Sequence, residues 1–302
     1  MARVPIHFMG LLANVDDSIT RVRLPDGVIV EKKPCNEVSS FVDRIEFLHG
    51  FTAALHSRLR APTGYFCITK PAVCEFEGVA GVSVIQQPFA LMNGFADVPR
   101  NLLRLLRLFK EGNPIIDCGF LCYEKNLGVG ITNVGVEYPI ADNGFFTLTD
   151  SGIPEAQSFI DTVSLPLPGS LELAFKSFEL SYEVHDRALA FLSLMISMES
   201  MLGPNSPGEL THQVSRNAAV LLGATRSESQ EVYRNVKSLY AKRSAIVHGG
   251  KGNLTPEDVL TLREHVRKTL RELHAMAISD KKQVQETLNP CGFGERPWKK
   301  SE

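Results

Sequence analysis

Helix-start and helix-stop signals in residues 170–280 constrain the fold more than any other feature of the chain. Residues 206–209 (S-P-G-E) and 225–228 (T-R-S-E) place a hydroxyl side chain three positions before a glutamate, and such a pair satisfies the free N–H groups of a helix start. A third start is indicated at residues 255–258 (T-P-E-D), with proline at the first helical position. Gly249 and Gly250 provide a helix-stop signal between the second and third starts.

Apolar residues follow these starts at spacings of three and four, which is typical of the buried face of a helix. Residues 171–202 have the same spacing, with a break indicated near residues 184–186. Four helices with short connections favour an antiparallel four-helix bundle over residues 170–280. Residues 281–302 are polar, with two prolines and two glycines, and are predicted to form a loose tail.

Residues 1–165 have a different pattern and are predicted to form a mixed α/β domain, which makes the whole chain an α+β protein. The turn residues Pro25, Asp26 and Gly27 lie between apolar positions and predict a hairpin. Further strands are predicted at residues 65–69, 81–85, 115–123, 130–138 and 145–149, and helices at 100–110 and 154–163. The Pro- and Gly-rich residues 163–170 are predicted to be the domain boundary.

Composition excludes several classes of protein. The formal net charge is −2, and neither half of the chain has the basic excess of a protein that coats nucleic acid. The six cysteines form no C-x-x-C motif and are too sparse for a disulfide scaffold, so neither a metal site nor a cofactor is predicted. The longest apolar run, residues 188–198, is too short to span a bilayer, and residues 1–12 do not resemble a signal peptide. A cytoplasmic protein without a membrane partner is expected.

The most informative stretch is residues 239–250, L-Y-A-K-R-S-A-I-V-H-G-G, at the end of the third predicted helix. Arg243 and His248 are five positions apart, which separates them by about 140° around a helix. They converge if the last turn loosens at the glycines, or if two copies of the helix meet across a dimer. Near a helix C-terminus, His248 is favoured as a cation. The apolar side of this helix is predicted to carry Val232, Val236, Leu239, Tyr240, Ile246 and Val247.

The segment R-S-A-I-V-H-G resembles the R-x-x-x-x-H motif of HEPN domains, a superfamily of α-helical bundles. Three blocks in the same order resemble the Apea-like HEPN branch: residues 194–202, 209–223 and 238–250. The resemblance covers roughly residues 175–278, about a third of the chain. Residues 1–165 are similar to the less characterised N-terminal region that accompanies this branch.

The resemblance implies a metal-independent RNA endonuclease that forms a homodimer through its helical bundle, plausible in phage defence or a toxin system. His248 would be the general acid/base and Arg243 would hold the scissile phosphate. Ser244 would hydrogen-bond to the phosphate or the 2′-hydroxyl. The N-terminal domain would sense a trigger or select the substrate. Gly250 stands where one subtype has a tyrosine, which argues against the tyrosine-modified form of the toxin.

Two alternatives remain open. One is a non-catalytic binding or dimerisation module for a nucleotide, RNA or protein. The other is a purely structural role, with Arg243 and His248 buried and paired within one chain. Lys242 and Lys251 are candidate phosphate contacts, although exposed lysines are common.

Two further positions near the motif are candidates for supporting roles. Tyr240 is a candidate for base stacking, although at this spacing it also suits the core. Glu199 lies on an apolar stripe and needs a partner. We expect a structural pair with Arg216, and the alternative is a pair that orients Arg243.

Overall fold

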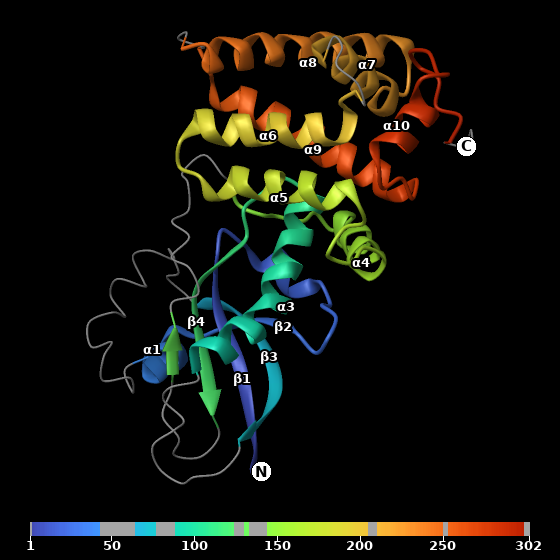
Figure 1. Cartoon of the computed structure of the whole chain (residues 1–302). Coiled ribbons are helices and arrows are strands. Elements are labelled where there is room, and N and C mark those ends of the chain that lie inside the picture. The colour runs from blue at the N-terminus through green and yellow to red at the C-terminus, as the bar shows by residue number, and fades with distance from the viewer. Residues whose placement is uncertain are drawn as a thin grey trace. The chain divides into compact units, whose positions relative to one another are not determined.

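The computed structural model (Figure 1) describes residues 2–42, 64–76, 88–123, 130–132, 144–204, 210–249 and 253–298. The chain divides into two compact units, Met1–Ser164 and Leu165–Glu302. The division falls within the Pro- and Gly-rich residues 163–170. The first unit combines a sheet with helices and the second is helical, so the α+β class is confirmed.

The described part of the first unit contains a five-stranded antiparallel sheet in the order β2-β3-β1-β4-β5. Its strands are β1 (Ala2–Ala13), β2 (Ile29–Lys33), β3 (Tyr65–Phe76), β4 (Ile115–Tyr123) and β5 (Gly130–Thr132). The sequence analysis did not predict the central strand β1. The reason is that successive residues from Phe8 to Ala13 are buried, so the strand lacks the alternation of a half-exposed strand.

The helical elements of this unit are η1 (Asp17–Arg21), α1 (Cys35–Val42), α3 (Pro88–Phe109) and α4 (Gly152–Thr162). The helices predicted at 100–110 and 154–163 are confirmed, although the first is longer than expected. The strands predicted at 65–69 and 115–123 are also confirmed.

Three other predictions for this unit fare differently. The hairpin prediction is wrong: Asp26 and Gly27 do turn with positive φ, but β2 pairs with β3 and not with residues before the turn. Residues 145–149 form only a single bridge, between Phe146 and Val15. Residues 81–85 and 133–138 lie outside the described residues.

The described part of the second unit contains α5 (Ser170–Glu183), α6 (Arg187–Leu202), α7 (Leu210–Leu222), α8 (Arg226–Val247), α9 (Pro256–Ala275) and α10 (Lys281–Leu288). The predicted break is confirmed, because α5 ends at Glu183 and Asp186 caps α6 by accepting a hydrogen bond from the Leu189 amide at 2.9 Å. The starts of α8 and α9 are both reciprocal capping boxes, as their sequences indicate. The start predicted at residues 206–209 lies outside the described residues.

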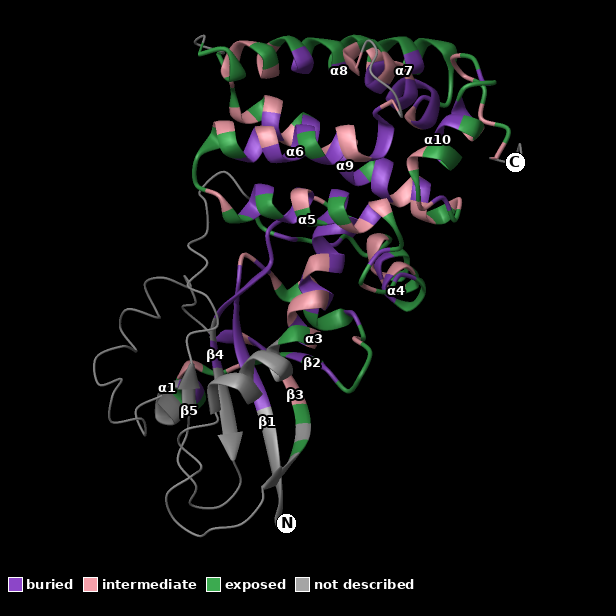
Figure 2. Ribbon diagram, viewed as in Figure 1, coloured by how far each residue is buried: buried purple, intermediate pink, exposed green. Residues whose placement is uncertain are grey.

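The prediction that residues 281–302 form a loose tail is wrong for their first part. This part, α10, is a helix that buries Val284 and Leu288, with Asp280 accepting a hydrogen bond at its start. Figure 2 shows that the helices of this unit turn their buried residues inward. The core also contains two arginines of α9: Arg263 lies 4.2 Å over the Tyr182 ring, and Arg267 donates a 2.9 Å hydrogen bond to the Tyr182 hydroxyl. None of the described helices has the length and apolar character that a membrane span requires.

Candidate functional site

The R-x-x-x-x-H segment forms the C-terminal end of α8. His248 is the C-cap residue, and its backbone N–H donates to the carbonyl of Ser244 at 3.1 Å. Gly249 follows with a φ of +74°, a left-handed conformation that glycine adopts without strain. The helix therefore ends where the two glycines predict. The side chains of Ser244 and His248 are exposed on this last turn.

Arg243 forms an ion pair with Glu199 of α6. The Arg243 Nε atom lies 3.5 Å from the Glu199 Oε1 atom, and the side chains are 34% and 21% exposed. Helices α6 and α8 run in opposite directions side by side (Figure 1). The prediction that Glu199 pairs with Arg216 is wrong. Glu199 pairs with Arg243, which was the alternative. The contact is an ion pair and not a hydrogen bond, because the Glu199 Oε1 atom has no hydrogen-bond partner among the described residues.

Arg216 has a different structural role. Its guanidinium donates hydrogen bonds to the carbonyls of Leu288 (3.3 Å), Asn289 (3.1 Å) and Cys291 (2.8 Å). These carbonyls lie at the end of α10, where a helix leaves carbonyls without partners. Arg216 therefore fastens the end of α10 to α7. Sequence reasoning missed this partner because it did not predict α10.

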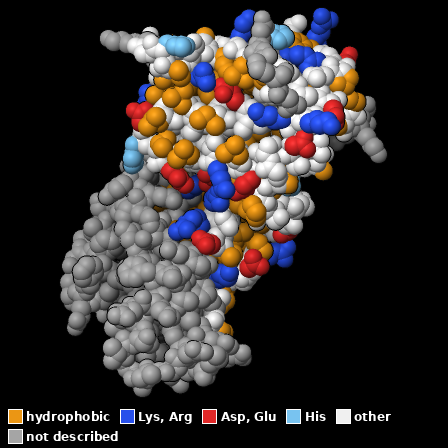
Figure 3. All heavy atoms as spheres, in the orientation of Figure 1, with side chains coloured by type: hydrophobic (Ala, Val, Ile, Leu, Met, Phe, Trp, Pro, Cys, Tyr) orange, Lys and Arg blue, Asp and Glu red, His pale blue; other side chains and the backbone are white. Residues whose placement is uncertain are grey.

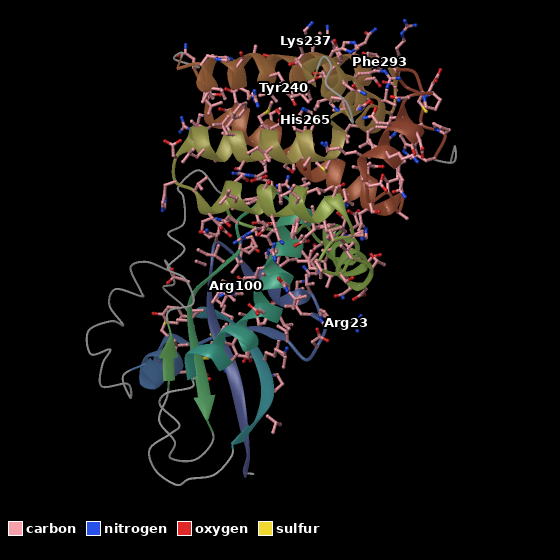
Figure 4. The ribbon with its side chains drawn as sticks, viewed as in Figure 1. Arg23, Arg100, Lys237, Tyr240, His265 and Phe293 are labelled. Carbon is pink, nitrogen blue, oxygen red and sulfur yellow. The ribbon has the colours of Figure 1, made fainter. Side chains whose placement is uncertain are left out.

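Tyr240 lies beneath the ion pair and is only 4% exposed. Burial raises the pKa of its hydroxyl, the Glu199 carboxylate raises that pKa further, and Arg243 opposes the change. Among the described residues, the hydroxyl has no hydrogen-bond partner of standard geometry. Because the ring is enclosed, it offers no face to a base. The proposed stacking role of Tyr240 is therefore not supported, and Tyr240 belongs to the core (Figure 4).

The Lys242 side chain contacts the start of the neighbouring helix α9. Its Nζ atom donates to Asp258 Oδ2 at 2.6 Å, and Asp258 is part of the capping box of α9. Burial acts to raise the pKa of Asp258, but hydrogen bonds from Lys242 and Thr255 outweigh it and hold the pKa below its ordinary value. The charge of Lys242 is thus engaged within the unit. Lys251 lies outside the described residues.

Apolar side chains flank the ion pair on the surface. Ile196 precedes Glu199 by one turn on α6, and Val247 follows Arg243 by one turn on α8. Since the helices are antiparallel and joined at Glu199 and Arg243, these two residues lie on the same side of the pair. They are 53% and 51% exposed, which corrects the prediction that Val247 faces the core. Figure 3 shows hydrophobic side chains on the visible face of this unit, interspersed with both basic and acidic ones.

The described residues contain no hydrogen bond or ion pair between Arg243 and His248. His248 is exposed and Arg243 is half-buried, which disagrees with the alternative that both are buried and paired within one chain. Nor do the described residues contain a group of three or more His, Cys, Asp and Glu side chains that could hold a metal ion. Comparison with models of known families, with curated proteins and with solved structures finds no match.

Proposed function

We propose that the helical unit is a metal-independent endoribonuclease of the HEPN type, with Arg243, Ser244 and His248 as its catalytic side chains. One observation carries the proposal: the Glu199 carboxylate lies beside one edge of the Arg243 guanidinium, while Ser244 and His248 stay exposed on the adjoining turn. Among the described residues, no hydrogen bond occupies the two terminal nitrogens of Arg243. A planar guanidinium with a free edge suits a phosphate, which it binds through two parallel hydrogen bonds.

The reaction needs one base and one acid, which the two His248 side chains of a dimer supply. The 2′-hydroxyl of the nucleotide attacks its own 3′-phosphorus, and the 5′-oxygen of the next nucleotide leaves. His248 removes the proton from the 2′-hydroxyl or supplies one to the 5′-oxygen. Arg243 stabilises the charge that accumulates on the phosphate oxygens, and the Ser244 hydroxyl donates a hydrogen bond to one of them. The products are a 2′,3′-cyclic phosphate and a 5′-hydroxyl, so DNA is not a substrate.

We propose that two copies of the chain complete the site. Within one α8, Arg243 and His248 are about 140° apart, so one helix does not direct both to the same phosphate. The exposed Ile196 and Val247 give this surface the apolar character that a symmetric contact buries. In such a dimer, the His248 side chain of one protomer faces the Arg243 side chain of its partner. The N-terminal unit would then receive the trigger or select the RNA.

Cleavage of labelled single-stranded and structured RNA in EDTA tests the proposal. We expect the wild-type protein to cut and to leave cyclic-phosphate ends, and both His248→Ala and Arg243→Ala to lose at least a hundredfold in rate. Glu257→Gln, at an exposed position on α9, serves as the matched surface control. Cutting that survives in both variants would overturn the assignment. RNA binding without cutting by the wild type would favour a non-catalytic binding module.

A further inference from the structure

Three rings from three separate segments meet at the surface of the helical unit. His212 of α7 lies edge-on to Tyr233 of α8, with 6.1 Å between ring centroids. Phe293, which follows α10, lies 5.9 Å from Tyr233 on a tilted plane. The Nζ atom of Lys237 sits 5.8 Å from the centroid of the same Tyr233 ring. We call Tyr233, His212, Phe293 and Lys237 the ring cluster.

The ring cluster is open to solvent, which distinguishes it from core packing. His212 and Lys237 are exposed, while Tyr233 and Phe293 are only half-buried. Figure 4 shows Lys237 on the outer side of α8, whereas Tyr240, three residues along, is directed inward. An ordinary core tyrosine of this helix is enclosed, as Tyr240 is. The cluster therefore leaves aromatic surface beside a cation.

Basic side chains predominate on α8 from Tyr233 onward, although exposed Glu231 and Glu295 lie two residues from Tyr233 and Phe293. Residues 232–247 contain four Lys and Arg and no Asp or Glu. Two of the four, Lys242 and Arg243, pair with acidic side chains. The other two, Arg234 and Lys237, are exposed, and within the described ranges neither forms an ion pair. Unpaired cations beside open rings suit a ligand that carries phosphates and flat bases.

The ring cluster and the end of α8 share one flank of the helix. At 100° per residue, Tyr233, Lys237, Ser244 and His248 fall within about 60° of one another. Tyr233 and Ser244 are about 16 Å apart along the helix axis, given a rise of about 1.5 Å per residue. The exposed residues between Tyr233 and Ser244 carry no acidic side chain: they are Arg234, Asn235, Lys237, Ser238 and Ala241. This flank borders the buried face of α8, where Tyr240 lies, and its exposed side joins the ring cluster to Ser244 and His248.

We propose that the ring cluster stacks a base of single-stranded RNA and that the strand follows this flank of α8. The base lies against Tyr233, and the neighbouring phosphates face Arg234 and Lys237. Bases of a duplex are stacked on each other and do not present their faces, so the site selects unpaired RNA. The direction of the strand, toward Ser244 and His248, rests on the proposed function, whereas the stacking site does not.

Fluorescence anisotropy with a short labelled oligouridylate tests the stacking site. The full chain carries His248→Ala so that the probe stays intact during the measurement. Tyr233→Leu removes the aromatic face but keeps apolar contact with Phe293, and we expect it to weaken binding about 5- to 150-fold, as loss of one stacked base does. Tyr233→Phe keeps the ring and should restore binding. Lys237→Gln should weaken binding and its salt dependence, and Lys282→Gln, on the 81% exposed lysine of α10, is the matched control.

Equal binding by the Tyr233→Leu and Tyr233→Phe chains would overturn the inference, as would equal competition by duplex RNA. If Tyr233→Leu does not fold, Phe293→Leu provides the same test, and photo-crosslinking of 5-iodouridine RNA to Tyr233 provides a direct one. Binding is read without cleavage, so the two proposals fail separately. If the wild type binds by stacking but does not cut, only the nuclease proposal is contradicted. If it cuts but does not bind by stacking, only the stacking-site proposal is contradicted.

Discussion

The Glu199 carboxylate of α6 lies 3.5 Å from the Nε atom of Arg243 of α8, and this pair links the two helices beside the R-x-x-x-x-H segment. The contact uses the inner edge of the guanidinium. Under the proposed function, we expect this ion pair to bias the position of Arg243 and to leave its two terminal nitrogens for a phosphate.

The Glu199→Gln variant tests this orienting role. The amide keeps the size of the side chain but removes its charge, so the guanidinium is held less firmly. We expect kcat for RNA cleavage to fall about 3- to 10-fold. The free energy of unfolding should fall by less than about 1 kcal/mol, because the pair is partly exposed to solvent.

Saturating-substrate kinetics and urea unfolding of the same preparations measure these two effects. Glu286→Gln, which changes an exposed carboxylate of α10, serves as the control. A loss of stability with an unaltered kcat would show that Glu199 is structural only.

Tyr240 provides a test of the packing beneath the ion pair. Tyr240→Ala should cost about 3–5 kcal/mol, the usual cost of removing a buried ring. Tyr240→Phe should be neutral or stabilising by up to about 1 kcal/mol, because the hydroxyl is buried without a hydrogen bond of standard geometry. Urea unfolding measures both. A clear loss of stability in Tyr240→Phe would instead reveal a bond from the hydroxyl to Glu199.

The buried side chain of His265 on α9 should make the stability of the protein depend on pH. Burial, followed by the charge of Lys268, lowers the pKa of His265 to about 4 from its ordinary value of 6.5. The unfolded chain takes up a proton below pH 6.5, while the folded chain resists it until about pH 4. Stability from this residue is therefore complete above pH 6.5 and is lost as the pH falls toward 4. At pH 5 the loss is about 2 kcal/mol.

Unfolding of the wild type and of His265→Gln at pH 7.5 and pH 5 isolates this effect. Groups other than His265 contribute equally to both proteins, so the difference between their pH responses belongs to this side chain. We expect the wild type to lose about 2 kcal/mol more than the variant between the two pH values. Parallel losses in the two proteins would mean that His265 is protonated as readily in the folded chain.

A comparison of Lys242 with Arg234 tests which cations of α8 have a structural role and which bind RNA. Because it bonds Asp258 in the capping box of α9, Lys242→Gln should lower the free energy of unfolding by about 1 kcal/mol. RNA binding should weaken less than in Arg234→Gln, whose guanidinium is exposed. Anisotropy and urea unfolding on the two variants give the comparison. The reverse order of binding losses would restore Lys242 to the RNA-binding residues.

Local signals in the sequence predicted much of the helical unit. Helix ends depend on residues that are neighbours in the sequence, so the sequence predicts them directly. This holds for the capping boxes at residues 225–228 and 255–258, the break after Glu183 and the stop at Gly249. The central strand β1 was missed because burial on both faces removes the alternation that identifies a strand. Helix α10 was missed because its apolar positions are few among polar residues.

Partners between helices were harder to predict. Glu199 was expected to need a partner and Arg216 was the expected one, but which side chains meet depends on how α6, α7, α8 and α10 pack. The ring cluster was missed for the same reason, because His212, Tyr233 and Phe293 are far apart in sequence. The exposure of Val247 also follows from packing, since no neighbouring helix covers that position within the described residues.

Replacement of a single hydroxyl in the RNA tests the central claim most directly. Once a cleavage position is mapped, the same RNA is made with a 2′-O-methyl group on the nucleotide before the scissile bond and is incubated with the wild-type protein in EDTA. The account predicts that cutting at this position stops while neighbouring positions are unaffected, and that the unmodified RNA gives a 2′,3′-cyclic phosphate. Cutting of the methylated position, or of DNA of the same sequence, would contradict it.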